Sequence, residues 1–306
     1  VCEGSKHMSA AGDDETATLR RLGLEGKARL ACMCRVSGPV VIDRDPTSAA
    51  PEPTLAAPAA PAVDHALASG VARVVIIGNG VAGTSAAEHL RRLSDSLQID
   101  MITSEPLHFY NRMAIGRLIY GRAGMDGLQL IPDNWYAKNR VEVWRNSIAR
   151  SVDRQNKTVL LATGESLPYD KLILATGAHC TTPDPDFLSF DNAFVLRSAE
   201  DAQALRQHVQ LRRARRALVI GGGVLGVEAA DALHHLGLHV TLLQRSDRLM
   251  NTQLDHQGAA RLAAYLEGIG IQVLTEVNVS RWEGQGEGLR AAWLAHGSCA
   301  RADVFV

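Results

Sequence analysis

The stretch from Arg216 to Arg245, RALVIGGGVLGVEAADALHHLGLHVTLLQR, combines the local signals that decide the fold of this chain. It opens with a short apolar run, continues through glycines into a segment with helical spacing, and ends in a second apolar run. Continuous runs of Val, Ile and Leu are typical of parallel strands that are buried on both faces. Strand, glycine turn, helix and strand in this order predict a βαβ unit that binds a dinucleotide.

Glycines occupy the positions of this unit at which a dinucleotide motif requires them. Gly221, Gly223 and Gly226 fit the spacing G-x-G-x-x-G. The first glycine permits the tight turn, the second lets the backbone approach a pyrophosphate, and the third allows the helix to pack closely on the strand. The free N–H groups and the positive dipole of the helix N-terminus then hold the phosphates.

The same pattern occurs earlier in the chain, in RVVIIGNGVAG at positions 73–83. Gly78, Gly80 and Gly83 again fit G-x-G-x-x-G between a Val/Ile-rich run and a segment with helical spacing. Glu105 lies 22 positions beyond Gly83, after a further apolar run, near the place where a carboxylate binds ribose hydroxyls. The sequence therefore predicts two dinucleotide sites.

The second motif lacks a carboxylate at its ribose position. Gln244 stands 18 positions beyond Gly226, and Arg245 follows it. A carboxylate there would bind the 2′-hydroxyl of NAD and repel a 2′-phosphate, whereas an arginine accommodates that phosphate. The sequence thus permits NADPH as well as NADH, and it leaves open that Arg245 is a surface cation without a role.

Composition and length set the class of protein. A chain of 306 residues with a net charge of −1 is long enough for two domains and carries no sign of a nucleic-acid-binding surface. Apolar runs stay well short of the roughly 20 residues that a membrane helix needs. The start of the chain has no apolar segment of the secretory type, and five cysteines are too few for a disulfide framework. We therefore expect a cytoplasmic protein that binds neither nucleic acid nor membrane.

The first seventy residues differ from the rest. Pro46–Ala62 is rich in Ala and Pro and predicts a linker behind a disordered tail. Cys32 and Cys34 form a C-x-C pair, as in the first half of small iron–sulfur or rubredoxin-like modules, but such a centre needs four ligands and no second pair follows before the linker. Two ordinary cysteines in a short or degenerate module are the favoured interpretation, and a metal or iron–sulfur module stays open. His234 and His235 are adjacent on a helix and point about 100° apart, so they cannot chelate one ion together. The sequence predicts no metal site.

Several stretches carry a resemblance to a known family, among them SEPLHFYNRMAIGRLIYG, DNWYAKNRVEVW, YDKLILATGA and RLMNTQLD. The region from about residue 71 to 306 resembles the pyridine nucleotide–disulfide oxidoreductases, flavoproteins that bind FAD and NAD(P)H. Within that family it is most similar to the FAD/NAD(P)H portion of assimilatory nitrite reductase large subunits, with ferredoxin and rubredoxin reductases nearby.

The resemblance implies roles for individual residues. Glu105 would bind the adenosine ribose of FAD, and Arg112, in YNR, matches an arginine that contacts FAD in relatives. Thr176 and Gly177 match the A-T-G turn, at which the chain passes close to the flavin. Glu228, in LGVEAA, matches a glutamate near the nicotinamide half of the site. The first glycine motif would cradle the FAD pyrophosphate; surface roles for Arg112 and Glu228 are the alternatives.

Departures from the family pattern narrow the chemistry. Ferredoxin reductases of this class have a lysine at about the position of Arg117, so the arginine weakens the interpretation of this chain as a ferredoxin reductase. Disulfide reductases carry a C-x4-C beside the flavin, but this chain has no cysteine between Cys34 and Cys180. Turnover through a thiol is therefore not expected, and Cys180 is interpreted as an incidental thiol.

Together these observations predict an α/β protein with two Rossmann-like domains of the FAD/NAD(P)-binding fold. Residues 1–70 form the tail and linker, 71–187 an incomplete FAD-binding domain, and 188–306 the NAD(P)H-binding domain. The final CARADVFV reads as the last strand of the second domain, whereas the family chain then returns to the FAD domain, so we expect a C-terminally truncated fragment.

The predicted function is an FAD-dependent NAD(P)H oxidoreductase that takes a hydride to FAD and passes electrons to an acceptor. The acceptor would be an iron–sulfur or siroheme module or a small electron-carrier protein. A ferredoxin- or rubredoxin-type reductase, a regulatory flavin-binding protein and a fragment that binds neither nucleotide remain alternatives. No side chain is predicted to act as a catalytic acid or base.

Overall fold

The computed structural model describes residues 5–21, 25–26, 28–30, 34–40, 70–121, 124–182, 184 and 186–306. The chain divides into two compact units, Val1–Gly70 with His89–Leu97 and Val71–Glu88 with Gln98–Val306. Both glycine motifs lie in the second unit. The Ala/Pro-rich segment and Cys32 lie outside the described residues, so the predictions made for them stay predictions.

The described part of the first unit contains helix α1, Asp13–Arg21, and an isolated antiparallel bridge between Met8 and Val36. Glu15 of α1 is buried, with 1% of its surface exposed. Its carboxylate accepts hydrogen bonds from Arg29 Nε at 2.7 Å and from the backbone N–H of Leu30 at 2.9 Å. The bond from Arg29 is the main reason that the pKa of Glu15 falls to about 2.

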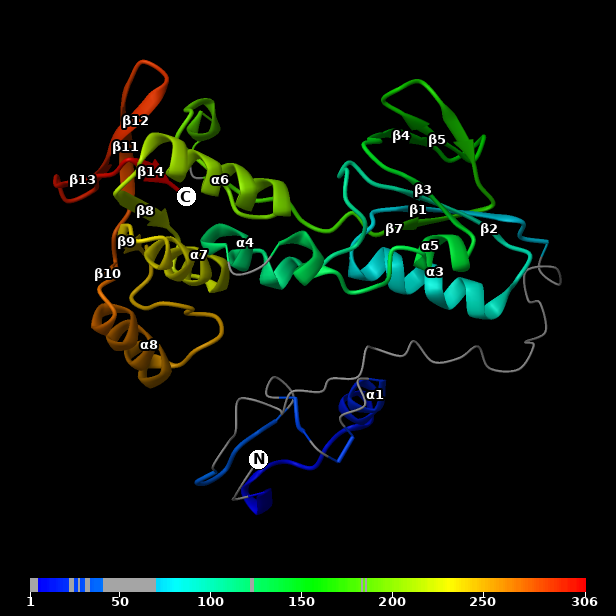
Figure 1. The fold of residues 1–306 in the computed structure, drawn as a ribbon, viewed down its shortest axis with the longest axis horizontal. Coiled ribbons are helices and arrows are strands. Elements are labelled where there is room, and N and C mark those ends of the chain that lie inside the picture. The colour runs from blue at the N-terminus through cyan, green and yellow to red at the C-terminus, as the bar shows by residue number, and fades with distance from the viewer. Residues whose placement is uncertain are drawn as a thin grey trace. The chain divides into compact units, whose positions relative to one another are not determined.

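A four-stranded parallel sheet in the order β3-β2-β1-β7 organises the first half of the second unit (Figure 1). Its strands are β1 (Arg73–Ile77), β2 (Gln98–Ile102), β3 (Val141–Trp144) and β7 (Lys171–Leu174). Helix α3, Val81–Leu93, connects β1 to its parallel neighbour β2. The predicted strand, glycine turn, helix and strand are therefore confirmed here.

A second sheet repeats this arrangement, with the order β10-β9-β8-β14 (Figure 1). Its strands are β8 (Arg216–Ile220), β9 (His239–Leu243), β10 (Gln272–Leu274) and β14 (Val304–Phe305). Helix α7, Val224–His235, connects β8 to β9. The final residues form a strand parallel to β8, as the sequence predicted. The α/β class with two Rossmann-like halves is confirmed.

An antiparallel three-stranded meander precedes the fourth strand of each sheet. The first meander consists of β4 (Ala149–Asp153), β5 (Thr158–Leu161) and β6 (Ser166–Pro168). The second consists of β11 (Val279–Gln285), β12 (Gly288–Leu294) and β13 (Cys299–Arg301). Each meander packs its apolar side chains with those of its own sheet, so that each half has a meander in its core.

An aspartate joins the fourth strand to the first strand in the same way in both halves. Asp170 Oδ2 accepts hydrogen bonds from two consecutive N–H groups at the start of β1, both at 2.8 Å. Asp303 Oδ2 accepts from the equivalent pair at the start of β8, both at 2.9 Å. These bonds lower the pKa of both carboxyl groups, whereas burial of Asp303 opposes the shift. The two halves are therefore structural repeats down to the contacts that set strand register.

The remaining elements of the second unit are the helices α4 (Gly116–Tyr120), α5 (Trp135–Lys138), α6 (Ala199–Arg212) and α8 (His256–Gly268) and the 3₁₀ helices Arg112–Ala114, Met125–Leu128 and Phe187–Ser189. Among them α4 has an unexpected location. It comes from the segment between β2 and β3, yet Leu118 and Ile119 belong to the same buried core as Leu205 of α6 and Leu233 of α7. The first half thus contributes to the core of the second half.

Truncating Ile119 tests this shared core. Its side chain is 0% exposed, so Ile119→Ala is expected to lower the free energy of unfolding by about 2–5 kcal/mol through lost burial and a residual cavity. Leu211→Ala, on α6, is the control, because Leu211 is 72% exposed and should change stability by no more than about 0.5 kcal/mol. Urea unfolding measures both. Equal stability of the two variants would contradict the packing of α4 into this core.

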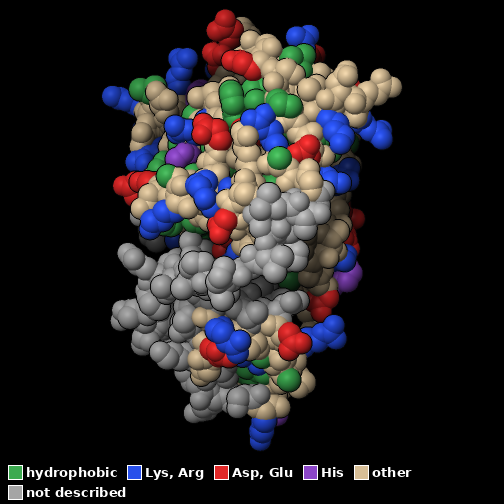
Figure 2. Space-filling view, turned by 90° about the vertical axis from the view of Figure 1, so that its right-hand side faces the viewer, with side chains coloured by type: hydrophobic (Ala, Val, Ile, Leu, Met, Phe, Trp, Pro, Cys, Tyr) green, Lys and Arg blue, Asp and Glu red, His purple; other side chains and the backbone are tan. Residues whose placement is uncertain are grey.

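Among the described residues, no helix combines the length and the apolar character that a membrane span requires. Figure 2 shows one face of the molecule, on which Lys and Arg side chains alternate with Asp and Glu over the described residues. Such mixing agrees with the formal charge of −1. The described part of this face therefore presents no field of a single sign that would attract a polyanion.

Candidate functional site

A cleft of about 630 Å³ lies where β1 and β2 end. Its walls are the glycine turn after β1, the residues after β2, the turn after β7 and the segment before α6. The cleft brings together most residues that were predicted to bind the first dinucleotide, namely Gly78, Gly80, Glu105, Arg112, Thr176 and Gly177.

The glycines of the first motif serve different purposes. Gly78 has a φ of +117°, and a Cβ there would lie 2.1 Å from the carbonyl oxygen of Ala175. A Cβ at Gly83 would lie 1.9 Å from the carbonyl oxygen of Gly78. The fold itself therefore requires both glycines. A Cβ at Gly80 would meet no protein atom within 4 Å, and Gly80 has no positive φ, so the fold itself does not require a glycine there. Gly80 lines the cleft, and a glycine at this position of the motif lets a ligand approach the backbone closely.

The second motif repeats this division. Gly221 has a φ of +117°, and a Cβ at Gly226 would lie 1.7 Å from the carbonyl oxygen of Gly221. A Cβ at Gly223 would again meet nothing within 4 Å. All three glycines line a cleft of about 400 Å³ at the end of β8, which Cys180 also lines. Each half thus has an open middle glycine beside a cleft at the carboxyl end of its first strand, which is where open α/β sheets bind ligands.

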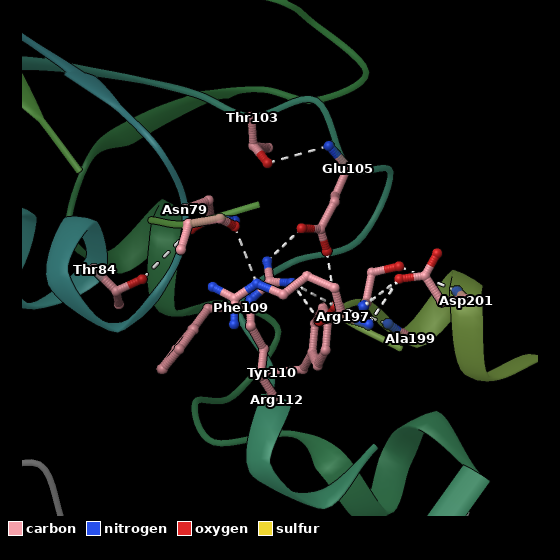
Figure 3. A network of polar contacts seen from close by, with 12 residues as sticks. Asn79, Thr84, Thr103, Glu105, Phe109, Tyr110, Arg112, Arg197, Ala199 and Asp201 are labelled. Carbon is pink, nitrogen blue, oxygen red and sulfur yellow. Dashed lines mark hydrogen bonds and ion pairs between the residues drawn. The ribbon is translucent and has the colours of Figure 1, made fainter. Parts of the chain in front are cut away.

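Glu105 forms a network with two residues of the YNR segment (Figure 3). Arg112 Nη2 donates to Glu105 Oε1, and the hydroxyl of Tyr110 donates to Oε2 at 2.8 Å. The guanidinium of Arg112 also lies over the Tyr110 ring, 5.0 Å from its centroid. A carboxylate has about four acceptor sites, so Glu105 keeps acceptors for ribose hydroxyls while these partners orient it. Sequence spacing did not predict this ion pair.

Asn79, between the first two glycines, carries a buried donor without a partner. Its Oδ1 accepts from the hydroxyl of Tyr136 at 2.8 Å and from Thr84 Oγ1 at 3.4 Å. These two donors orient the amide, and Nδ2 is left buried with no hydrogen-bond partner in the described structure. An unpaired buried donor costs about 1–3 kcal/mol, which an acceptor on a ligand would recover. Asn79 and the open backbone of Gly80 fit a pyrophosphate-bearing cofactor such as FAD.

Arg197 is a further cation at the first cleft that the sequence did not indicate. Its Nε donates to the carbonyl oxygen of Ala178 at 3.1 Å, directly after the A-T-G turn. Gly177 of that turn has a φ of +72°, which favours glycine. Arg197 and Arg112 both line the cleft, so it offers two guanidinium groups to an anionic ligand.

The side-chain amide of Gln244 points into the protein and not towards solvent. The residue is 7% exposed, its Oε1 accepts from the N–H of Gly222 at 3.1 Å, and its Nε2 donates to the carbonyl oxygen of Arg248 at 3.2 Å. Both ends of the amide therefore hold the glycine turn against the loop after β9. Arg245, the next residue, is exposed. Their roles at a nucleotide stay predictions.

Glu228 and Cys180 complete the predicted positions of the second half. Glu228 lies exposed on α7, and partial desolvation raises the pKa of its carboxyl group. Desolvation also raises the pKa of the Cys180 thiol, which therefore stays protonated at neutral pH. All described cysteines are free thiols, and within the described part of the chain no cluster of His, Cys, Asp and Glu could hold a metal ion.

Comparison with known proteins agrees with this architecture. The family model described as pyridine nucleotide-disulphide oxidoreductase matches residues 72–306. The chain is 32% identical over 233 residues to the biphenyl dioxygenase system ferredoxin–NAD(+) reductase component of Paraburkholderia xenovorans (strain LB400), covering 76% of this chain and 56% of the relative. It is 32% identical over 237 residues to the nitrite reductase (NADH) large subunit of Escherichia coli (strain K12), covering 76% and 28%.

Solved structures of other reductases also match the fold of this chain. A NAD-dependent persulfide reductase from A. fulgidus matches with a TM-score of 0.71 and 29% identity, over 76% of this chain and 44% of that one. The covalent putidaredoxin reductase–putidaredoxin complex matches with a TM-score of 0.70 and 26% identity, over 76% and 57%. The chain thus spans between about a quarter and somewhat over half of these relatives. FAD and NAD(P)H are the cofactors of these homologues. The chain belongs to the pyridine nucleotide-disulphide oxidoreductase family.

Proposed function

We propose that this chain is the hydride-accepting part of an FAD-dependent NAD(P)H oxidoreductase, with FAD in the first cleft and NAD(P)H in the second. The observation that carries the proposal is the open middle glycine beside each cleft, Gly80 and Gly223, for which the protein's own packing supplies no reason. Membership of the family supports the pair of cofactors.

The chain's own residues would bind and orient the first nucleotide. Gly80 leaves room for the pyrophosphate at the N-terminus of α3, where free N–H groups and the helix dipole favour negative charge. Glu105 would accept hydrogen bonds from the ribose hydroxyls, and the ion pair with Arg112 would hold its carboxylate in place. The bound flavin would supply a ring that takes a hydride from the nicotinamide and passes electrons on.

The acceptor is proposed to be a separate electron carrier or an iron–sulfur or siroheme module. Relatives named for ferredoxin, for rubredoxin and for nitrite support this class. Among the described residues that line the first cleft there is no cysteine, and the Cys180 thiol stays protonated, so a thiol relay is not part of the proposal. Free thiols also support the expected cytoplasmic location.

The absorption spectrum of the purified chain, after incubation with FAD and gel filtration, tests the proposal. A retained flavin band that bleaches under anaerobic titration with NADPH or NADH would support it. A retained band that neither nucleotide bleaches would instead indicate a regulatory flavin-binding protein. Loss of all flavin on the column would contradict the proposal for this chain.

Arg245 is expected to favour NADPH over NADH. Gln244 is occupied by backbone groups, and Arg248 is held by the carbonyl oxygen of Leu254 at 3.3 Å, which leaves Arg245 as the exposed cation after β9. Arg245→Gln should lower kcat/KM for NADPH by about tenfold or more, since a charge-assisted bond to phosphate is worth about 1.5–3 kcal/mol, and should change NADH little.

Rapid anaerobic reduction with each nucleotide measures this preference. Arg301→Gln, on the exposed surface of β13, is the matched control and should alter neither rate. An equal loss for NADPH and NADH in the Arg245 variant would show that the arginine does not read the 2′-phosphate.

A further inference from the structure

Tyr110 connects the first cleft to the second half of the protein (Figure 3). It is 4% exposed and belongs to the core that contains α6 and α7, although it follows β2 of the first half. Its hydroxyl donates to Glu105 Oε2 at 2.8 Å. The hydroxyl oxygen of Tyr110 also accepts hydrogen bonds from the backbone N–H of Ala199 at 2.9 Å and from Arg112 Nη1 at 3.1 Å.

The contact with Ala199 completes the N-terminus of α6. A helix leaves its first N–H groups without intrahelical partners. Ser198 Oγ accepts from the N–H of Asp201 at 3.1 Å, and Asp201 Oδ2 accepts from the N–H of Ser198 at 2.7 Å, so these two residues cap each other. Ala199 is 0% exposed, and its N–H reaches the tyrosine hydroxyl of a segment 89 positions earlier in the chain.

The chain before α6 runs along both clefts. Phe194, Val195 and Leu196 line the cleft of the second half, whereas Arg197 and Ser198 line the first cleft. The residue that follows them is Ala199, which Tyr110 holds. The hydroxyl of Tyr110 therefore fixes the end of a short segment that forms a wall of both clefts.

The direction of these hydrogen bonds is determined by the groups themselves. A tyrosine hydroxyl has one proton, and the carboxylate of Glu105 can only accept a hydrogen bond, so the hydroxyl of Tyr110 donates its hydrogen bond to Glu105. The N–H of Ala199 and the guanidinium of Arg112 then donate to the oxygen lone pairs. Hydrogen bonds in such a chain polarise one another, so a change at Glu105 is felt at Ala199.

We infer that Tyr110 is a positioning residue that couples the two nucleotide sites, so that occupation of the first cleft strengthens binding in the second. Ribose hydroxyls that order Glu105 would also order Tyr110 and, through it, the wall before α6. Thermodynamic linkage requires the effect to be reciprocal. This inference rests on the proposed function, because it assigns FAD and NAD(P)H to the two clefts.

The test needs a probe that cannot touch the flavin directly. 2′-Phospho-ADP-ribose lacks the nicotinamide, and Glu105 disfavours its phosphate in the first cleft. Calorimetry measures its Kd for the flavin-free and the FAD-loaded chain. We expect FAD to tighten binding by about fivefold or more, within the usual range of coupling between sites, and Tyr110→Phe to bring the ratio of the two Kd values close to one.

Two further variants separate coupling from loss of structure. Tyr136→Phe removes another buried tyrosine hydroxyl, 5% exposed as a residue, whose partners Asn79 and Phe109 both belong to the first half. It should weaken FAD but keep the ratio. Ala199→Pro removes the N–H that donates to Tyr110, at a helix position that accepts proline, and its ring displaces the Tyr110 hydroxyl from the N-terminus of α6. It should therefore bring the ratio of the two Kd values close to one.

The outcomes are distinct. A ratio near one in the wild-type chain, or an unchanged ratio in both Tyr110→Phe and Ala199→Pro, would overturn the coupling while leaving the proposed function intact. A ratio near one in Tyr136→Phe as well would also overturn the coupling through Tyr110, because any perturbation of the first cleft would then be enough to remove the effect of FAD on the second cleft. A wild-type chain that binds no FAD would overturn the proposed function and this inference together.

Discussion

Gly80→Val is expected to give a folded chain that no longer retains FAD. The added side chain meets no protein atom within 4 Å of its Cβ, so the turn and α3 can form as before. It occupies the space through which the pyrophosphate must approach the backbone. Losing two charge-assisted phosphate bonds of about 1.5–3 kcal/mol each would weaken FAD at least about 100-fold.

Flavin fluorescence titration gives the affinity, and circular dichroism shows whether the variant folds. Gly116→Val in α4 is the matched control, because its Cβ also meets nothing within 4 Å and it does not line the cleft. Gly83→Ala should behave differently and unfold more readily, since its Cβ would lie 1.9 Å from a backbone carbonyl oxygen. Normal FAD affinity in a folded Gly80→Val chain would exclude the first cleft as the pyrophosphate site.

Gly223→Val is expected to keep FAD but to abolish its reduction by NAD(P)H. Gly223 precedes α7 with φ −78° and ψ −176°, a backbone conformation that valine adopts without strain. Its Cβ meets nothing within 4 Å, so the second half should fold. The side chain would nevertheless stand where the nucleotide pyrophosphate approaches the helix N-terminus.

Anaerobic stopped-flow absorbance is the measurement, and we expect the bleaching rate at a fixed NADPH concentration to fall by at least about 100-fold, for the same loss of phosphate bonds. Dithionite should still bleach the flavin of the variant, which shows that the first site is intact. A wild-type rate with NADPH in Gly223→Val would mean that the nucleotide enters elsewhere. The two glycine variants together assign one cofactor to each cleft.

Much of this architecture follows from local sequence. The apolar runs, the glycine spacing and the helical segments lie within about thirty consecutive residues, and each has a steric meaning that needs no distant partner. Gly83 illustrates this, because the clash that excludes a Cβ there involves the carbonyl oxygen of Gly78 in the same turn. For this reason both parallel sheets and both glycine turns could be predicted.

The site could be predicted only in outline. Spacing placed Glu105 near a ribose, but not its bonds to Tyr110 and Arg112. Gln244 stood at a nucleotide position, yet its amide faces Gly222 and the following loop. The direction of a side chain depends on which donors and acceptors surround it. Many of these groups come from segments that are distant in sequence, and the spacing of residues along the chain does not show which of those segments will meet.

By itself, then, the sequence determined two βαβ units with a glycine turn after the first strand of each, because periodicity acts between near neighbours. Only the tertiary structure decided that Ile119 packs into the core of the other half, and that Tyr110 receives the N–H of Ala199. A short run such as LIY, at positions 118–120, shows that it is apolar but not which surface it will cover. Contacts across 89 positions form only when the folded chain brings them together.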